Sequence, residues 1–350
     1  MNIESCNLDS LRKIVRELQR ENKELRELLK KENIPYAASE VFQDTPFMVE
    51  EYELDQGARI VQQYIDRNVA TRFFSMFWGR EDVFARRAKN GNYYPQCNNR
   101  WNHTLCPKQK GEKKYCEDCE SKSWIKLTPD ILVNHLVGYR EDGTDVIGVY
   151  PLLLDGTCRF LVFDFDNHEK DAEKKDFANE DGAWHDEVDA LRLICSQNGI
   201  DALVERSRSG RGAHVWIFFR KAISAETARN FGFLLLDKGA ATINLKSFRY
   251  YDRMYPSQDE INSIGNLIAL PLQGQALKNG NSAFVDENWN AYPNQWGRLL
   301  QTRKLSQDEV EQYIVKWQGE LFIQHGTSHY LNATSIRHPI RITNTAEQIR

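Results

Sequence analysis

Two aspartates interrupt a run of apolar residues, FLVFDFD at 160–166, that otherwise has the composition of a buried β-strand. Side chains two positions apart on a strand share one face, so Asp164 and Asp166 point the same way while Phe163 and Phe165 point the other way. Burying two like charges without partners is costly. A divalent cation offsets that cost, because carboxylate oxygens suit Mg²⁺ and Mn²⁺. The alternative, a pair of surface aspartates on an edge strand, fits poorly with the apolar residues around them.

The elements expected around this strand follow the order β-α-β-β-α-β. Hydrophobic periodicity and capping residues indicate a helix at 186–199 and then two strands joined by a tight turn at 203–219. A second helix at 224–239 and a final strand at 265–272 follow. This order predicts an α/β (α+β) fold with a split-βαβ sheet, both helices on one face and the aspartate strand in a central position. A closing helix is expected near residue 306.

A glycine-rich turn, SRSGRGAHVW, comes directly before one of the predicted strands. Gly210 and Gly212 allow backbone amides to approach an anion, and the Arg211 guanidinium adds a fork for phosphate. Ser209 would shape the turn, and His214 at the start of the strand can donate to a phosphate oxygen. Such a turn is weak evidence alone, since many hairpins contain glycines and a lone histidine is more often structural. The neighbouring aspartate pair favours phosphate binding.

A third acid is expected, because two metal ions about 3.5–4 Å apart need more than two carboxylates. The stretch FRYYDRMYPSQDE offers Asp252 and Asp259. Asp252 follows an aromatic run that can form a short strand, which makes it the better candidate. Asp259 lies in an expected loop and is the alternative.

Four cysteines cluster in a C-x8-C-x9-C-x2-C arrangement, formed by Cys97, Cys106, Cys116 and Cys119. Four thiolates with a final C-x2-C spacing predict one structural Zn²⁺ in tetrahedral coordination. His103 is a possible substitute ligand, and a redox pair or unrelated thiols are the alternatives. Lysines in the same segment fit either a solvated loop or phosphate contacts, namely Lys108, Lys110, Lys113 and Lys114.

The N-terminal segment has the heptad pattern of a coiled coil over residues 8–29. Positions a and d of the heptad are filled by Leu8, Leu11, Val15, Leu18, Asn22, Leu25 and Leu29. Three apolar heptads with one asparagine at position a fit a parallel two-stranded zipper, and therefore a homodimer. Ile14 and Leu28 widen the apolar stripe, so packing against the rest of the chain is the alternative.

The 350 residues suffice for one large core or two smaller ones. We expect a coiled coil at 1–33, an N-terminal α/β unit at 34–150 with a zinc module at 96–120, a catalytic unit at 151–300, and a helix with a tail at 301–350. The net charge of −4 means that nucleic acid would need a local basic surface, with Lys246 and Arg249 as candidates. No apolar run approaches the about 18 residues that span a membrane, and no signal-peptide pattern opens the chain, so we expect a cytoplasmic protein without membrane contact.

Three stretches, FDFD, SGRGAHVWIFF and YDRMYPSQDEINSIGNLIALPLQG, resemble the three motifs of archaeo-eukaryotic primase–polymerases: D-x-D/E, an S-x-H-type stretch and a hydrophobic-acid element. The sequence is most similar to the primase domain of TOTE conflict systems and to CRISPR-associated primase–polymerases. That similarity extends over residues 70–315 and includes GREDVFARR, the four-cysteine insertion, HLVG and NSAFVDENWNAYPNQW. The stretch INSIGNLIALPL departs from the pattern, since a more glycine-rich approach to the strand is expected there.

The resemblance implies an RRM-like catalytic core and template-directed nucleotidyl transfer from NTP or dNTP onto nucleic acid. In this interpretation Asp164, Asp166 and Asp252 hold two Mg²⁺ or Mn²⁺ ions, and residues 209–214 hold the triphosphate. A mobile-element or defence setting is also implied. TOTE proteins usually continue into helicase and nuclease regions, which we expect to be partner regions outside these residues.

Two other functions remain compatible with these motifs. A non-catalytic, zinc-containing nucleic-acid-binding module would keep the fold, although the intact acids and the glycine-rich turn argue against a decayed site. A metal-dependent glycosyltransferase also uses D-x-D to bind a sugar nucleotide. It would need a nucleotide-sugar domain before the motif, where the cysteine cluster stands instead.

Overall fold

The computed structural model describes residues 50–53, 59–62, 64–167, 183–244, 248–261 and 264–325, together with seven positions between residues 17 and 28. The chain divides into two compact units, Met1–Phe47 and Met48–Arg350. In the first unit the described positions are helical and exposed, and Leu25 is one of them. The other predicted heptad positions lie outside the described residues, as do Lys246 and the predicted tail after residue 325.

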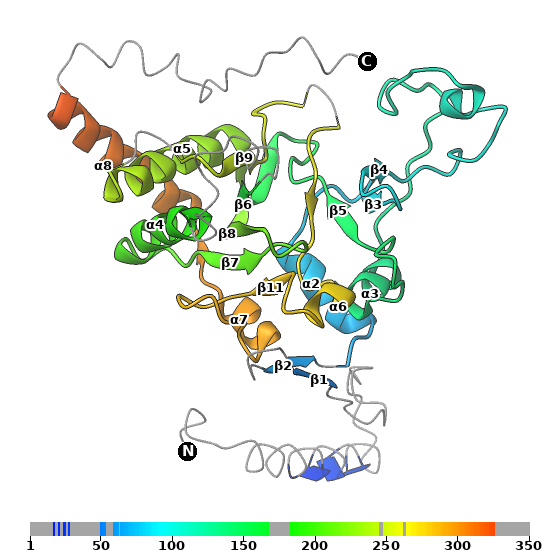
Figure 1. Cartoon of the computed structure of the whole chain (residues 1–350), viewed down its shortest axis with the longest axis horizontal. Helices are drawn as coiled ribbons and strands as arrows, with labels where there is room; N and C mark the ends of the chain where they lie inside the picture. The colour runs from blue at the N-terminus through cyan, green and yellow to red at the C-terminus, as the bar shows by residue number, and fades with distance from the viewer. Residues whose placement is uncertain are drawn as a thin grey trace. The chain divides into compact units, whose positions relative to one another are not determined.

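What we call the main sheet contains the strands β6 (Thr157–Asp166), β7 (Leu203–Arg206), β8 (Gly212–Ser224) and β9 (Tyr251–Tyr255). The crossover helix α4 (Ala183–Gln197) lies between β6 and β7 in the sequence, and α5 (Ala225–Thr242) lies between β8 and β9. The strands lie in the order β7-β8-β6-β9, each antiparallel to its neighbour. The aspartate strand β6 is therefore central, and the predicted split-βαβ arrangement is present (Figure 1). The sheet is extended by β11 (Ala283–Phe284) on β7 and by β12 (Lys304–Leu305), which is parallel to β8.

The last strand of the main sheet differs from the one expected at residues 265–272. Strand β9 fills that place, with Tyr255 opposite Val162 of β6. The apolar stretch expected there forms β10 (Ile268–Ala269), which pairs with β5 (Ile147–Val149) in another sheet. The later segment was favoured because its sequence is continuously apolar. Strand β9 carries the charged residues Asp252 and Arg253, so it has fewer apolar residues than a buried strand usually has.

A second sheet has the strand order β10-β5-β3-β4, which includes β3 (Ala85–Arg87) and β4 (Tyr93–Pro95). Near the start of the second unit, β1 (Glu50–Glu53) pairs with β2 (Arg59–Gln62). The remaining helical elements are α2 (Arg67–Met76), η3 (Pro107–Lys110), α3 (Pro129–Val137), α6 (Gly274–Leu277), α7 (Gln295–Gln301) and α8 (Gln307–His325). Among the described helices, none combines the length and the apolar character that crossing a membrane requires.

Helix ends follow the capping signals in the sequence. Ser224 caps α5, because its Oγ accepts a hydrogen bond of 3.0 Å from the Thr227 amide. Gly199 follows α4 with φ at 69°, in the left-handed region that glycine adopts readily. Gly138 ends α3 in the same way, with φ at 68°. These ends agree with the predicted helix boundaries.

Both faces of the main sheet are buried, against different partners. Leu161 and Phe163 of β6 pack with α4, α5 and α8 in one hydrophobic core. Phe160, Val162 and Trp216 point to the opposite face and pack with residues of α2, α3, β5 and α7 in a second core. From Phe160 onward, the sheet alternation therefore assigns Phe160, Val162 and both aspartates to the face shared with the N-terminal elements. The expected boundary between residues 150 and 151 falls inside the second compact unit.

A buried histidine joins α3 to this second core. His135 has no exposed surface; its Nδ1 accepts a hydrogen bond of 3.1 Å from the Ile147 amide, and its Nε2 lies 3.0 Å from the Pro271 carbonyl oxygen. Because Nδ1 accepts, Nε2 carries the proton and donates to the carbonyl. Burial lowers the pKa of His135 to about 4, although the Pro271 hydrogen bond opposes the shift. The ring is therefore a neutral structural element at physiological pH.

Candidate active site

The two predicted acids lie side by side on one face of β6. In the pairing with β8, Asp164 is opposite His214 and Asp166 is opposite Gly212. The Asp164 side chain is only 19% exposed. Burial raises the pKa of Asp164 to about 6, and the carboxylates of Asp252 and Asp166 add to the rise, while His214 and Arg253 oppose it. A carboxylate held among other carboxylates in a poorly solvated position is characteristic of a site that receives positive charge.

A register irregularity in β9 brings Asp252 to this group. Asp164 is opposite Arg253, whereas the next residue of β6, Phe165, is opposite Tyr251. Asp252 therefore has no partner position of its own on β6, as at a β-bulge, where the extra residue changes the direction of a side chain. Its carboxylate is 12% exposed, and Oδ2 accepts a hydrogen bond of 2.8 Å from Arg253 Nε. The influence of Asp252 on the Asp164 pKa places the two charges near one another.

A buried glutamate of α4 fixes the start of β9. Glu187 is 3% exposed, and its two carboxylate oxygens accept from the amides of Arg249 at 2.6 Å and Tyr250 at 2.8 Å. Two hydrogen bonds from consecutive amides hold the backbone immediately before Asp252. Arg249, a predicted nucleic-acid contact, is thus positioned through its backbone by α4. Glu187 carries no signal in the sequence that would identify this role.

The alternative third acid, Asp259, is held elsewhere by an arginine of α5. Arg229 Nε donates to Asp259 Oδ1 at 2.6 Å, and Arg229 Nη1 donates to the Pro256 carbonyl at 3.0 Å. The Arg229 side chain is 8% exposed, so this guanidinium requires a paired acid. The structure therefore brings Asp252, rather than Asp259, to the charge environment of Asp164.

The glycine-rich turn is stabilised by its own hydrogen bonds. The Gly210 amide donates to the Ser207 carbonyl at 3.0 Å, and the Ser207 amide donates to the Gly212 carbonyl at 2.8 Å. Ser209 Oγ lies 3.1 Å from Ser207 Oγ and accepts from the Arg211 amide at 3.3 Å. The Gly210 amide is thus used inside the turn, which differs from the expectation that it faces a phosphate.

Two glycines of this turn are required for different reasons. Gly210 has φ at 76°, a conformation that other residues rarely adopt. At Gly212 a Cβ would lie 2.2 Å from the Phe165 carbonyl oxygen, so only glycine allows β8 to approach β6 there. Gly212 therefore serves to bring the turn against Asp166, its pairing partner.

A buried glutamate, Glu205, orients His214. Glu205 was not predicted from the sequence. Glu205 of β7 is 1% exposed, and its Oε2 lies 2.9 Å from His214 Nδ1 and accepts at 2.9 Å from Trp216 Nε1. The other ring nitrogen, Nε2, lies 3.6 Å from Asp164 Oδ1. The symmetry of the hairpin about its turn could have identified the pair, because residues at 205 and 214 face one another across it.

Arg206 and Arg208, beside this glutamate, have different partners. Arg206 donates to the carbonyl oxygens of Gly280, at 3.0 Å, and of Trp289. Burial raises the pKa of Tyr93 in β4, and the nearby Arg208 opposes that rise. Arg206 therefore supports the loop around β11, whereas Arg208 carries its charge toward the second sheet.

The donor set suits Mg²⁺ or Mn²⁺, although the side chains are not drawn together around a point. Within the described part of the chain, no three His, Cys, Asp or Glu side chains form a group that could hold a metal ion. The three acidic residues lie on adjacent strands and supply only oxygen donors. Burial is the main cause of the raised pKa of Asp164, and the charges of Asp252 and Asp166 add to it although His214 and Arg253 oppose it. Residues Asp164, Asp166 and Asp252 therefore fit a divalent cation by chemistry and charge.

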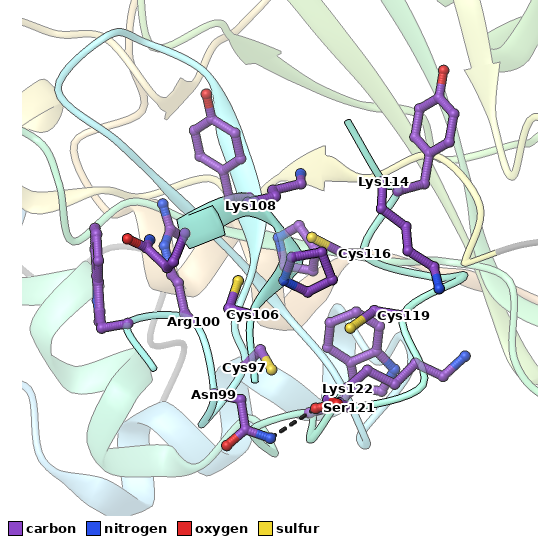
Figure 2. Close-up of a pocket in the computed structure, with 17 residues that line it drawn as sticks. Cys97, Asn99, Arg100, Cys106, Lys108, Lys114, Cys116, Cys119, Ser121 and Lys122 are labelled. Carbon is purple, nitrogen blue, oxygen red and sulfur yellow. Dashed lines mark hydrogen bonds between the residues drawn. The ribbon is translucent and has the colours of Figure 1, made fainter. Parts of the chain in front are cut away.

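The four clustered cysteines line one pocket of about 230 Å³, and Figure 2 shows their sulfur atoms around it. All four are free thiols. Cys97 Sγ accepts a hydrogen bond of 3.3 Å from the Ser123 amide, and Asn99 donates to the Ser121 carbonyl at 2.7 Å, which closes the base of the segment. His103 is exposed and does not line the pocket. The four thiols line the same pocket, but among the described residues they do not form a group that could hold a metal ion, so the predicted zinc site stays a prediction.

Residues 68–313 match the family model of the TOTE conflict system, Archaeo-Eukaryotic Primase domain. The match covers well over half of the 350 residues, so the chain belongs to this family, as its motifs predicted. Among solved structures, the chain is similar to the polymerase domain from Mycobacterium tuberculosis ligase D in complex with DNA, at 10% sequence identity and a TM-score of 0.31, over 79% of this chain and 94% of that chain. None of the curated proteins matches the sequence.

Proposed function

We propose that this protein is a primase–polymerase that transfers nucleotides from NTP or dNTP to a growing strand on a nucleic-acid template. Membership of the primase family supports this activity. The observation that carries it is the placement of Asp252 on β9 next to the β6 strand that carries Asp164 and Asp166, with His214 of β8 opposite Asp164. Carboxylates on one side and a cationic group on the other are what a metal–triphosphate complex requires.

The transfer forms one phosphorus–oxygen bond and breaks another. The 3′-hydroxyl oxygen of the strand attacks the α-phosphorus, the bond from that phosphorus to the bridging oxygen of the β-phosphate breaks, and pyrophosphate leaves. Asp164, Asp166 and Asp252 would hold two Mg²⁺ or Mn²⁺ ions, which when bound make the hydroxyl more acidic and neutralise the departing pyrophosphate. The hydroxyl proton passes to solvent.

The hairpin residues would hold the triphosphate during this reaction. Burial lowers the pKa of His214, but the Glu205 carboxylate and the charges of Asp164 and Asp166 outweigh burial and raise it to about 9. The ring is therefore positively charged at neutral pH and can donate from Nε2 to a phosphate oxygen. Arg211 is exposed beside it and offers a guanidinium fork, while Ser209 keeps the turn in shape.

The cysteine segment is proposed to hold one Zn²⁺ through Cys97, Cys106, Cys116 and Cys119. Four thiols around one pocket support this proposal, and the amide that donates to Cys97 Sγ is a contact that stabilises a thiolate. The ion would crosslink a segment that has few buried residues, since η3 has none. We further propose that helicase or nuclease regions act beside this domain, in the defence setting that the family name implies.

A primer-extension assay tests the activity. Wild-type protein, Mn²⁺, a primed template and labelled ribo- or deoxynucleotides should give extended products, and Asp164→Asn should abolish them. Asp308→Asn is the matched control, because Asp308 is an exposed aspartate in the first turn of α8. Equal extension by wild type and Asp164→Asn would remove the catalytic assignment. Binding of template without extension by any form would favour a non-catalytic binding module.

A further inference from the structure

A second cavity, of about 420 Å³, lies between the cysteine segment and the main sheet. Its walls come from β4, from the segment around η3 and Cys116, from β9, and from the chain that precedes β10. Its volume falls in the range of about 300–1,000 Å³ that is typical of ligand pockets. The catalytic residues proposed above do not line it, so its function is separate from holding the metal ions or the triphosphate.

One hydrogen bond joins two walls of this cavity. The Glu117 carboxylate, in the cysteine segment, accepts from the Ile264 amide at 2.9 Å, which joins that segment to the chain leading into β10. The cavity is therefore closed on one side by the cysteine segment and, through Arg253 and Tyr255, lies against β9 on the other.

The lining combines aromatic rings with positive charge. Five tyrosines contribute to it, namely Tyr93, Tyr94, Tyr115, Tyr150 and Tyr255. Tyr150 and Tyr255 are buried at the inner side, with 2% and 7% of their surface exposed, whereas Tyr115 is 76% exposed at the rim. The charged lining residues are Lys108, which is exposed, Arg253, and the acidic Glu117, whose carboxylate is engaged by the Ile264 amide. Rings that stack on bases, next to cations that contact phosphates, are characteristic of sites for single-stranded nucleic acid.

The position of Arg253 connects the cavity with the candidate active site. Arg253 lines the cavity, and its Nε donates to Asp252 Oδ2 at 2.8 Å. Tyr255, another lining residue, is opposite Val162 of β6, two positions from Asp164. A strand that occupies the cavity would therefore lead directly to the acids. The chain has a net charge of −4, so this concentration of cationic and aromatic groups is a local feature.

We infer that this cavity binds one nucleotide unit of a single-stranded nucleic acid, with its base against the tyrosines and its phosphate near Lys108 and Arg253. The inference rests on the proposed function, because it assigns the path of the strand that the acids would act on. It gives the cysteine segment a role, since Lys108 and Tyr115 of that segment form the outer wall.

Binding of a fluorescein-labelled single-stranded 15-mer DNA, measured by anisotropy without nucleotides, tests the inference. Tyr115→Ala should weaken binding about tenfold, the effect of losing one stacked base. Lys108→Ala should weaken it about threefold and reduce the salt dependence by the equivalent of about one phosphate contact. The matched controls are Tyr139→Ala and Lys221→Ala, because Tyr139 is 74% exposed and Lys221 is exposed, both outside the cavity. The controls should bind as wild type does.

A second measurement does not depend on substitutions. The same oligonucleotide with 5-iododeoxyuridine, which couples to aromatic rings under ultraviolet light, should crosslink to peptides that contain Tyr93, Tyr94 or Tyr115. Crosslinks confined to other peptides would overturn the inference. Variants with control-like affinity for the oligonucleotide would do the same.

The result for the cavity is distinguishable from the result for the proposed function. If Tyr115→Ala and Lys108→Ala bind the 15-mer as the controls do, and wild type extends primers while Asp164→Asn does not, then the polymerase stands and the strand takes another path. If these two variants lose thermal stabilisation by a free triphosphate but keep oligonucleotide affinity, the cavity takes a mononucleotide and the inference is wrong. Circular dichroism and zinc content should be unchanged in Tyr115→Ala, which adjoins Cys116.

Discussion

His214 and Glu205 form a hydrogen-bonded pair across the β7–β8 hairpin, with 2.9 Å between Nδ1 and the carboxylate oxygen. An ionised carboxylate only accepts, so Nδ1 must carry a proton, and Nε2 is the atom directed at Asp164. The same carboxylate oxygen also accepts from Trp216. Glu205 thus determines which edge of the imidazole meets the site, although it does not touch the proposed substrate.

Replacing Glu205 should weaken nucleotide binding to the extent that the His214 ring loses its orientation. In Glu205→Gln the amide oxygen can accept both hydrogen bonds, so the ring of His214 should keep its orientation. Glu205→Ala leaves Nδ1 and the Trp216 indole without an acceptor, and KM for the triphosphate should rise about tenfold with a smaller change in kcat. Nitrogen-15 shifts of the ring should report a lowered His214 pKa in both variants, because both remove the Glu205 charge, and a lost hydrogen bond at Nδ1 in the alanine variant alone. A purely structural role would lower the unfolding temperature of both variants and leave KM unchanged.

Asp252 and Asp259 should respond differently to the same substitution. Asp252→Asn should reduce primer extension at least about a hundredfold, because the site loses one of three anionic donors. Asp259→Asn should keep activity and lower the free energy of unfolding by about 1 kcal/mol, since Asp259 is partly exposed while its partner Arg229 is buried. Extension rates and urea denaturation measure the two effects. The reverse pattern would make Asp259 the third acid.

His135 should make the protein less stable in mild acid. Its pKa is lowered to about 4 in the folded protein and is near 6.5 in an unfolded chain, so the unfolded state binds the extra proton as pH falls. Stability is complete above about pH 6.5 and is lost progressively toward pH 4, by about 2 kcal/mol at pH 5. Urea denaturation at pH 7.5 and pH 5, compared between wild type and His135→Gln, isolates this contribution. An identical pH dependence in both proteins would contradict it.

Zinc analysis should find about one ion per chain, bound by the cysteine segment. Cys116→Ser should lower the zinc content and the unfolding temperature together, because binding free energy contributes to folding. His103→Ala is the control, since His103 is exposed and lies outside the thiol pocket, and it should retain full zinc. Zinc loss in the histidine variant would instead make His103 a ligand. Metal-free wild-type protein with an unchanged unfolding temperature would exclude a structural ion.

The N-terminal helix should produce a dimer. Leu25, at a heptad d position, is 57% exposed in the single chain, which leaves its side chain available to a second copy. Leu25→Glu should therefore convert a dimer to a monomer in light scattering. Leu154→Glu is the matched control, because Leu154 is 64% exposed in the second unit and should have no effect. A wild-type monomer would show that this helix has another function.

The sequence predicted the parts of the site that depend on local pattern. Alternation placed Asp164 and Asp166 on one strand face, and the glycine-rich stretch placed His214 beside them. The sequence also favoured Asp252 as the third acid on a possible short strand. It did not predict that this strand, β9, joins the main sheet, and the register shift at Asp252 depends on pairing with β6. Glu205 was missed for a similar reason, since a buried acid in a short strand is explained only by the partners it meets across the hairpin.

Strand β6 contributes side chains to two cores at once, and this limits how the protein can be shortened. A fragment beginning at residue 151 would leave Phe160, Val162, Trp216 and Phe218 uncovered, because their partners in the second core include α2, α3 and β5. Exposed apolar area costs about 25 cal/mol per Å², and a patch of this kind promotes aggregation. Expression of the fragment beginning at residue 151 alone would therefore yield insoluble material, and the shortest working form of the protein has to retain α2 and α3.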